Sequence, residues 1–97
     1  MFRDTVIVQN RRHVDDPHGG HYQGSGPAIT VAGVCVEAKD NGSDSSQIRI
    51  LIRGDWPGSI YSMIRWNGMT YDAVGAPIIR PHGFHAAHIV VTARRIA

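Results

Sequence analysis

Hydrophobic residues fall into short β-branched runs along the chain, and in the clearest run they alternate strictly with polar residues. Within residues 47–53, Ile48, Ile50 and Ile52 occupy every second position. This spacing indicates a strand whose isoleucines face a core, while the residues between them face water or a neighbouring molecule. Residues 28–38 are almost continuously apolar, which predicts a well-buried strand. Further strands are predicted at residues 5–9 and 87–96.

A β-hairpin is predicted over residues 62–73. The dipeptide Asn67-Gly68 lies between two β-type segments, and both central residues of a two-residue hairpin turn need positive φ, which Asn and Gly tolerate. One face of this hairpin should be buried and the other exposed. The buried face should carry the pairs Trp66–Met69, Ile64–Tyr71 and Ser62–Ala73, and the exposed face Arg65–Thr70 and Met63–Asp72.

The whole pattern predicts an all-β protein, formed by residues 1–97 as a single domain. No window shows a sustained helical period with capping residues, and about six short strands alternate with turns. We expect a small antiparallel β-barrel with long loops and little or no helix, because closure of the sheet removes the edges that short strands would otherwise expose.

Three segments are predicted as connections. Residues 10–27 contain four glycines and two prolines and should form a long flexible loop, of a length that is usually functional or mobile. Residues 39–46 have turn composition, and residues 75–86 form a Pro/Gly-rich connection. Trp56 lies in a separate short loop. It either folds back over the end of the barrel or anchors an interface, since Trp is enriched at binding hot spots.

Composition and charge narrow the possible functions. The net charge is +2, and nine of the ten basic residues are arginines that are scattered along the chain, so the signal for nucleic-acid binding is weak. The single cysteine, Cys35, excludes an internal disulfide and should be buried. No segment is long enough to span a membrane, and the N-terminus does not resemble a signal peptide, so the expected setting is the cytoplasm or an assembly formed there. A domain this small often gains stability from partners, so we expect an oligomer.

Histidines are the most conspicuous candidates for chemistry, and they form two groups: His13, His18 and His21, then His82, His85 and His88. Asp15 and Asp16 could join the first group around a metal. A Gly-rich loop fixes no ligand geometry, however, and we predict polar loop residues and no metal site.

Residue patterns for catalysis are also missing. There is no Gly-x-Ser-x-Gly motif, and the stretch His18-Gly-Gly-His21 is not followed by the Lys-Ser/Thr of a phosphate-binding loop. We therefore predict that the protein is not an enzyme and has no cofactor.

Single-strand nucleic-acid binding is an alternative, because small β-barrels can stack bases on aromatic side chains beside basic ones. The chain offers both kinds of residue: Tyr61, Trp66 and Tyr71, with Arg49, Arg53 and Arg65. Trp66 and Tyr71 share a predicted face with Ile64, which favours a place in the core.

The order of features resembles one known family. The chain begins with a short Phe-Arg-Asp-Thr-Val-Ile-Val-Gln-Asn-Arg segment and a Gly-rich stretch, continues with Arg65-Trp-Asn-Gly-Met-Thr-Tyr-Asp-Ala-Val-Gly-Ala-Pro77, and closes with His-Ile-Val-Val-Thr-Ala-Arg-Arg. This arrangement resembles the head-closure, or head-to-tail stopper, proteins of long-tailed bacteriophages. In that family a hairpin of the form x-x-Gly-x-x-Tyr-x-Val-x-Gly-x-Pro recurs before a variable loop and a closing strand. The matching positions are Gly68, Tyr71, Val74, Gly75 and Pro77.

The resemblance implies a small β-barrel that assembles into a homo-oligomeric ring of about twelve copies. The ring would lie in the neck of the virion, between the portal with its adaptor ring and the tail terminator or tail tube, without contact to a membrane. Such rings close the portal channel, retain the packaged double-stranded DNA and form the docking surface for the tail. Other components of the head–tail junction, such as a tail terminator or a minor tail protein, share the barrel and remain alternatives.

By analogy with the family, the 10–27 segment should reach into the lumen or onto a neighbouring ring. Its candidate contact residues are Arg11, Arg12, His13, Asp15, Asp16, His18, His21 and Tyr22. For contacts between subunits the candidates are Arg49, Arg53, Trp56 and Arg65. In one respect the chain departs from the family: members often carry a short helix between the second and third strands, and residues 39–46 are too few and too rich in Gly and Ser to form it.

Overall fold

The computed structural model describes residues 2–39, 46–84 and 87–96, and within these ranges every regular element is a β-strand. The strands are β1 (Asp4–Gln9), β2 (Arg11–Asp16), β3 (Gly19–Gly24), β4 (Ile29–Lys39), β5 (Gln47–Ile52), β6 (Met63–Trp66), β7 (Met69–Ala73), β8 (Ile78–Phe84) and β9 (Ala87–Arg95).

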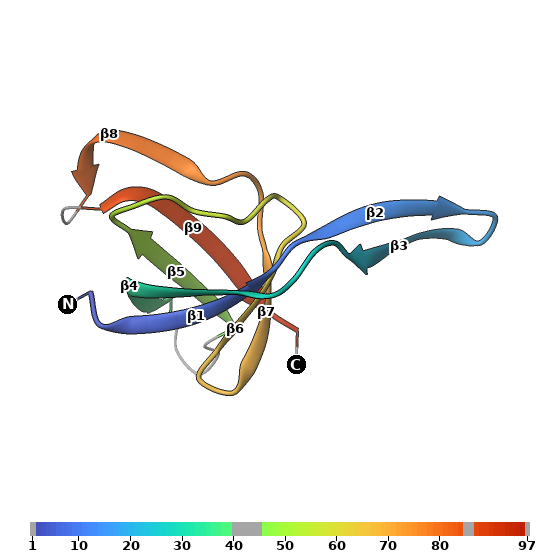
Figure 1. Cartoon of the computed structure of the whole chain (residues 1–97), viewed down its shortest axis with the longest axis horizontal. Coiled ribbons are helices and arrows are strands. Elements are labelled where there is room, and N and C mark those ends of the chain that lie inside the picture. Colours follow the sequence, from blue (N-terminus) through green and yellow to red (C-terminus); the bar gives the residue numbers. More distant parts are fainter. Residues whose placement is uncertain (1, 40–45, 85–86, 97) are drawn as a thin grey trace.

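Six of these strands form a closed antiparallel barrel, as predicted. They follow the order β5-β4-β1-β6-β7-β9, and pairing of β5 with β9 closes the sheet. The eighth strand, β8, adds to the barrel beside β9. The pair β2–β3 forms a separate two-stranded sheet that projects from one end of the barrel (Figure 1). The all-β prediction is therefore confirmed.

The β6–β7 hairpin has the predicted register. Met63 pairs with Asp72, Ile64 with Tyr71, Arg65 with Thr70 and Trp66 with Met69. Both turn residues have positive φ, 54° at Asn67 and 77° at Gly68, as a two-residue turn of this kind requires. The turn sequence was therefore sufficient to predict how these two strands pair.

The core lies inside the barrel and is formed by the alternating residues. Ile48, Ile50 and Ile52 are each at most 2% exposed, which confirms their predicted orientation. The main cluster is completed by Val6, Val8, Val34, Ile64, Tyr71, Ile89, Val91 and Ala93. No residue of β2 or β3 belongs to it.

A smaller buried cluster lies on the other side of β5. It contains Leu51, Val90 and Cys35, with Phe2 packed against it. The predicted burial of Cys35 is confirmed, and burial raises the pKa of its thiol above the ordinary value, with a smaller contribution from the negative charge of Glu37.

Two of the predicted connections contain β-strands. The prediction of an irregular loop over residues 10–27 is wrong, because this segment forms the β2–β3 hairpin, and residues 75–86 include β8. In β2–β3 the two strands satisfy each other's backbone hydrogen bonds without burying a hydrophobic face, so the hydrophobic alternation that predicts a strand is missing.

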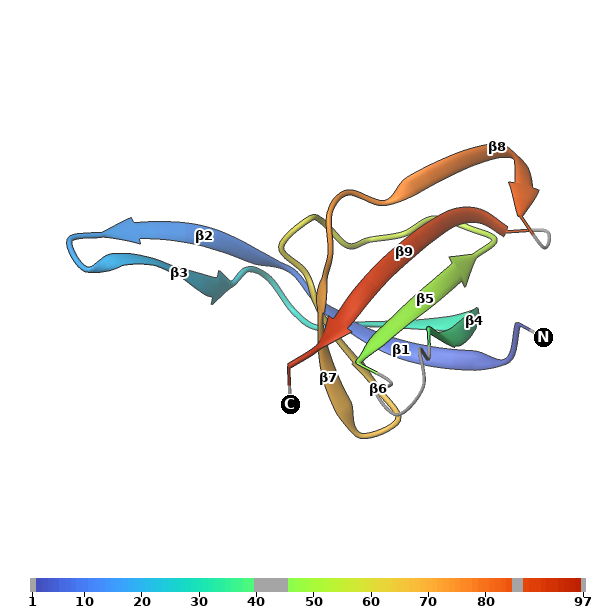
Figure 2. The same ribbon diagram turned by 180° about the vertical axis from the view of Figure 1, so that it is seen from behind.

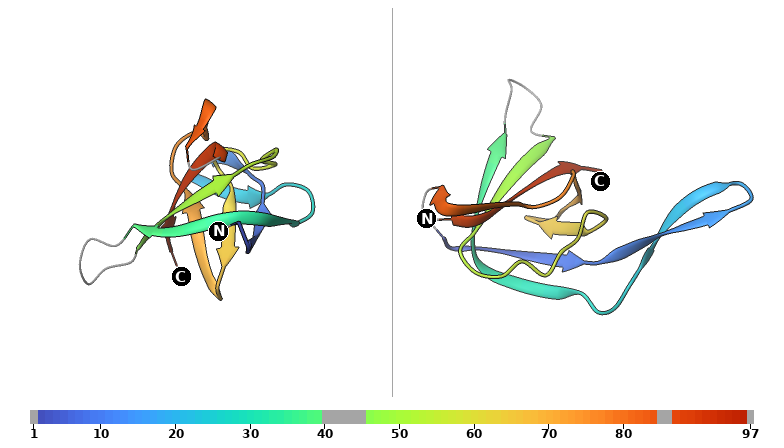
Figure 3. Two further views of the ribbon diagram at one scale, coloured as in Figure 1. Left: turned by 90° about the vertical axis from the view of Figure 1, so that its left-hand side faces the viewer. Right: turned by 90° about the horizontal axis from the view of Figure 1, so that it is seen from above.

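The two-stranded extension makes the molecule elongated. Its extents are 45 × 32 × 22 Å. The view from behind and the view from above show β2 and β3 leaving the barrel at the end opposite the N-terminus (Figures 2 and 3). No helix that could cross a membrane occurs in the described ranges.

Candidate functional site

The β2–β3 hairpin is the most distinctive feature of the surface, and we call it the arm. Its six cross-strand pairs run from Arg11–Gly24 at the base to Asp16–Gly19 at the tip. At the tip the backbone N–H of His18 donates to Oδ1 of Asp16 over 2.9 Å, and Gly19 takes a φ of 113°, where glycine is favoured. A short polar turn thus closes the arm.

Both faces of the arm are predominantly polar. Every residue of β3 is exposed, and β2 has only half-buried or exposed residues. Alternation along the strands places Arg11, His13, Asp15 and Tyr22 on one face, and Arg12, Val14, Asp16, His21 and Gln23 on the other. All eight residues predicted to contact the lumen or a partner lie on the arm or in its turn.

Arg11 fixes the base of the arm to the barrel. Its Nη2 lies 2.6 Å from Oδ1 of Asp72 in β7, and its Nε donates to the carbonyl oxygen of Tyr61 over 2.7 Å. Its guanidinium also lies 4.9 Å from the ring centroid of Tyr22. The Arg11 side chain is 15% exposed and that of Asp72 34%, so this ion pair is partly shielded from water.

A second set of contacts joins the end of β1 to the loop between β5 and β6. The amide of Asn10 donates to the carbonyl of Pro57 over 2.9 Å, and the hydroxyl of Ser62 donates to Oδ1 of Asn10 over 2.8 Å. Ser62 is fully buried, and its hydroxyl also accepts the backbone N–H of Ser59. These bonds hold the chain in place where it leaves the barrel to enter the arm.

Three rings form a cluster over the base of the arm. The ring centroids of Tyr22 and Tyr61 are 5.5 Å apart, and that of His13 lies 5.5 Å from Tyr22 and 6.4 Å from Tyr61. Gly20 makes room for this arrangement, because a Cβ there would collide with the imidazole of His13. Tyr22 is 50% exposed, so the cluster also presents aromatic surface to the solvent.

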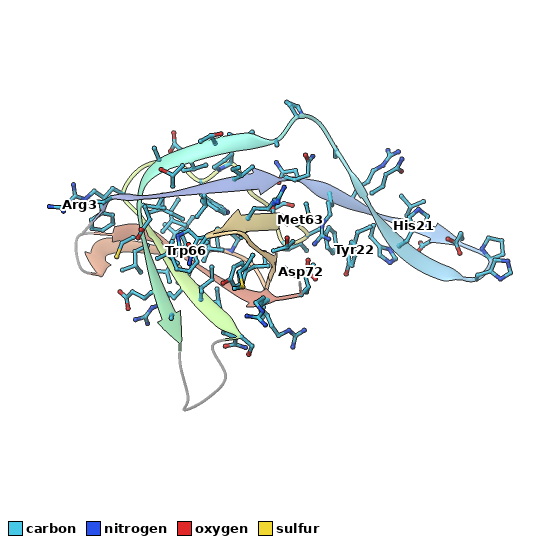
Figure 4. All side chains as sticks on the ribbon, turned by 90° about the horizontal axis from the view of Figure 1, so that it is seen from below. Arg3, His21, Tyr22, Met63, Trp66 and Asp72 are labelled. Atoms are coloured by element: carbon cyan, nitrogen blue, oxygen red, sulfur yellow. The ribbon has the colours of Figure 1, made fainter. Side chains whose placement is uncertain are left out.

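Beside this cluster lies a pocket of about 240 Å³, which we call the base pocket. It is lined by Arg11 and Tyr22 of the arm, by Tyr61, and by Asp72 and Arg94 on adjacent strands of the barrel. Figure 4 shows Tyr22 and Asp72 close together at the base, while His21 lies further out along the arm. Exposed Ile60 and Val74 complete the rim.

The histidines of the arm pair with its carboxylates. Nδ1 of His13 lies 3.2 Å from Asp15, and Nδ1 of His21 lies 2.9 Å from Asp16. Across the ranges that the structure describes, no three His, Cys, Asp or Glu residues converge as metal ligands. His85 lies outside the described residues, as do the side chains of His82 and His88, so the structure does not address the second histidine group.

The four residues predicted for contacts between subunits are not brought together. Arg49 bonds Glu37 of the neighbouring strand over 2.9 Å, and the guanidinium of Arg53 lies 4.2 Å from the ring centroid of Phe2. Arg65 is exposed on β6. Trp56 folds back and packs against the main core, as in the first of the two alternatives. Their role between subunits stays a prediction.

The aromatic residues considered for base stacking are divided between core and surface. Tyr71 is 3% exposed, and Trp66 is half-buried and packs against the main core, which confirms their predicted face. Tyr61 is exposed at the base pocket. A stacking platform made of all three residues is therefore not present.

Sequence reasoning missed the residues that anchor the arm, Asn10, Tyr61, Ser62 and Asp72, and it missed Arg94, which lines the base pocket. Asp72 and Arg94 were assigned only to strands, and the partners of Asn10 and Arg11 lie 47 to 61 residues away along the chain. The only local signal was the position of Asp72 on the exposed face of its hairpin, beside charged residues of the neighbouring strand.

Comparisons with known proteins identify a similar fold and give no information on function. No family model matches the chain, and no curated protein matches it. Among solved structures, the solution structure of protein SF1141 from Shigella flexneri 2a is similar, with a TM-score of 0.62 and 17% sequence identity, over 99% of this chain and 94% of that one. At this level of identity the similarity shows that the two chains share a fold.

Proposed function

We propose that this chain is a structural, non-enzymatic subunit of the neck of a long-tailed bacteriophage. As a head-to-tail stopper, it would form a ring that closes the portal channel, retains packaged double-stranded DNA and offers the tail its docking surface. The arm would reach the lumen or the adjoining ring.

The observation that carries this proposal is the arm on its closed barrel. The barrel has its own core, while the arm exposes almost all of its surface and is fixed only at its base. An isolated two-stranded hairpin is marginally stable in water. An arm of this kind is therefore suited to contacts with another molecule, and a ring subunit needs such a segment beside a rigid wall.

The positions that match the family motif support the proposal in a second way, because three of the five have an identifiable structural task. Gly68 and Gly75 have φ values of 77° and 73°, which favour glycine, and Tyr71 is buried in the core. The motif therefore specifies the turn of the hairpin, its inner face and its exit. The resemblance rests on residues that shape the barrel wall.

Electron microscopy of particles assembled without this chain tests the proposal. We expect heads that have lost their DNA, together with free, complete tails, and we expect added full-length chain to restore tailed particles. A matched variant replaces residues 12–23 by Asn-Gly, a two-residue turn that joins the paired residues Arg11 and Gly24. This arm-less variant should not restore tailed particles.

Other outcomes would overturn the stopper function in different ways. Normal tailed particles in the absence of the chain would exclude a role in the neck. Filled heads with tails of abnormal length would indicate a tail terminator. If the arm-less variant restored tailed particles, the arm would not be needed for head closure or for tail attachment.

A further inference from the structure

The base pocket carries a net positive charge. Two arginines, Arg11 and Arg94, face one carboxylate, Asp72. Asp72 already bonds Arg11 over 2.6 Å, whereas no hydrogen bond or ion pair engages the guanidinium of Arg94 within the described part of the chain. The pocket therefore offers a cationic group beside the hydroxyl-bearing rings of Tyr22 and Tyr61, a combination suited to a carboxylate.

The tip of the arm carries the complementary charge. Asp15 is 94% exposed, and Asp16 lies next to it. These two carboxylates give the tip its negative charge. Asp15 also lies on the same face of the arm as Arg11 and Tyr22, which line the pocket.

The tip cannot enter the pocket of its own chain. Asp15 is four residues from Arg11 along an extended strand, a separation of about 13 Å. The arm points away from the barrel in Figures 1 and 2 and in the right-hand view of Figure 3. A second copy of the chain has no such constraint.

We propose that the tip of the arm of one copy docks in the base pocket of the next copy, with Asp15 facing Arg94. This inference rests on the proposed function and changes one part of it: the tip of the arm contacts the next subunit of the same ring, in place of the lumen or the adjoining ring. Tip and pocket are different surfaces, so the contact is head-to-tail and repeats from copy to copy, closing into a ring where the rotation allows. The exposed Tyr22, Tyr61 and Ile60 would gain cover in this contact.

A charge exchange between two variants tests the contact. In Asp15→Arg residue 15 carries the same positive charge as Arg94, and in Arg94→Asp residue 94 carries the same negative charge as Asp15, so each variant alone should associate at least tenfold more weakly than the unchanged chain in sedimentation velocity. In an equimolar mixture, residue 15 of each variant can face a residue 94 of opposite charge on the other. The mixture should regain the association of the unchanged chain, and salt should weaken it.

The mixture contains only the two proteins that fail singly, so misfolding cannot produce a restored association. Arg3→Asp is the matched control, because it makes the same charge change at an exposed residue at the far end of the barrel (Figure 4). It should associate as the unchanged chain does, and because it supplies no acidic residue 94 for the basic tip of Asp15→Arg, its mixture with Asp15→Arg should associate less than the mixture of Asp15→Arg with Arg94→Asp.

Failure of this contact and failure of the proposed function give different results. An unchanged chain that stays monomeric, or a mixture that associates no better than its components, would overturn the tip-to-pocket contact. Neither result would alter the particles seen when the chain is omitted.

Discussion

At the scale of single residues, Arg11 has the most consequential contacts outside the core. It joins the arm to β7 through Asp72 and to the loop before β6 through the carbonyl of Tyr61. We predict that Arg11→Met lowers the free energy of unfolding by about 1–3 kcal/mol, because it leaves the partly buried carboxylate of Asp72 without its charged donor. Denaturant unfolding followed by tryptophan fluorescence measures this loss.

The neighbouring arginine provides the control for that measurement. Arg12 lies on the opposite face of the arm and contacts only Gln23, over a long 3.4 Å, among the hydrogen bonds of the described residues. Arg12→Met should change the free energy of unfolding by no more than about 0.5 kcal/mol. Equal losses in the two variants would show that the Arg11–Asp72 contact does not stabilise the fold.

At the scale of elements, the strands that bury a face were predictable and those that do not were missed. The alternation in β5 and the Asn67-Gly68 turn each follow from a local rule, so strand, register and core face could be predicted together. The strands β2 and β3 bury nothing inside the barrel, and their glycines and aspartates have low strand preference. Only their mutual pairing makes them strands, and sequence patterns do not report such pairing.

The candidate site was predictable in its location and not in its construction. The long polar segment identified the arm because such segments rarely occur without a function. The pocket at its base combines side chains from the arm, the loop before β6, β7 and β9. Contacts between residues so far apart depend on closure of the barrel, which the local pattern near Arg11 or Arg94 does not encode.

The arm and barrel should differ in local stability. The backbone hydrogen bonds of β2 and β3 are exposed to solvent, whereas β5 and β9 pair with each other over the buried core. We predict that amide hydrogens in residues 11–24 of the free chain exchange at least a hundredfold faster than those of β5, because the arm opens without unfolding the barrel. Residue-resolved hydrogen exchange measures this difference. Similar protection in the two regions would mean that the arm unfolds only with the barrel.

At the scale of the whole molecule, the structure separates a barrel that has its own core from an arm that contributes no residue to it. Every residue of the two buried clusters lies outside β2 and β3. We predict that the arm-less variant, with residues 12–23 replaced by Asn-Gly, folds with a free energy of unfolding within about 1 kcal/mol of the full chain, since surface changes of this kind cost little. It keeps Arg11 and therefore the bond to Asp72.

Two measurements on this variant test whether the barrel folds without the arm and whether the chain associates without it. Denaturant unfolding should give nearly the same midpoint as the full chain, and sedimentation should show a monomer at concentrations where the full chain associates. The barrel would then be sufficient for folding, and the arm necessary for assembly. A large loss of stability would instead make the arm part of the folding unit, and its exposure would have to be explained by something other than a partner.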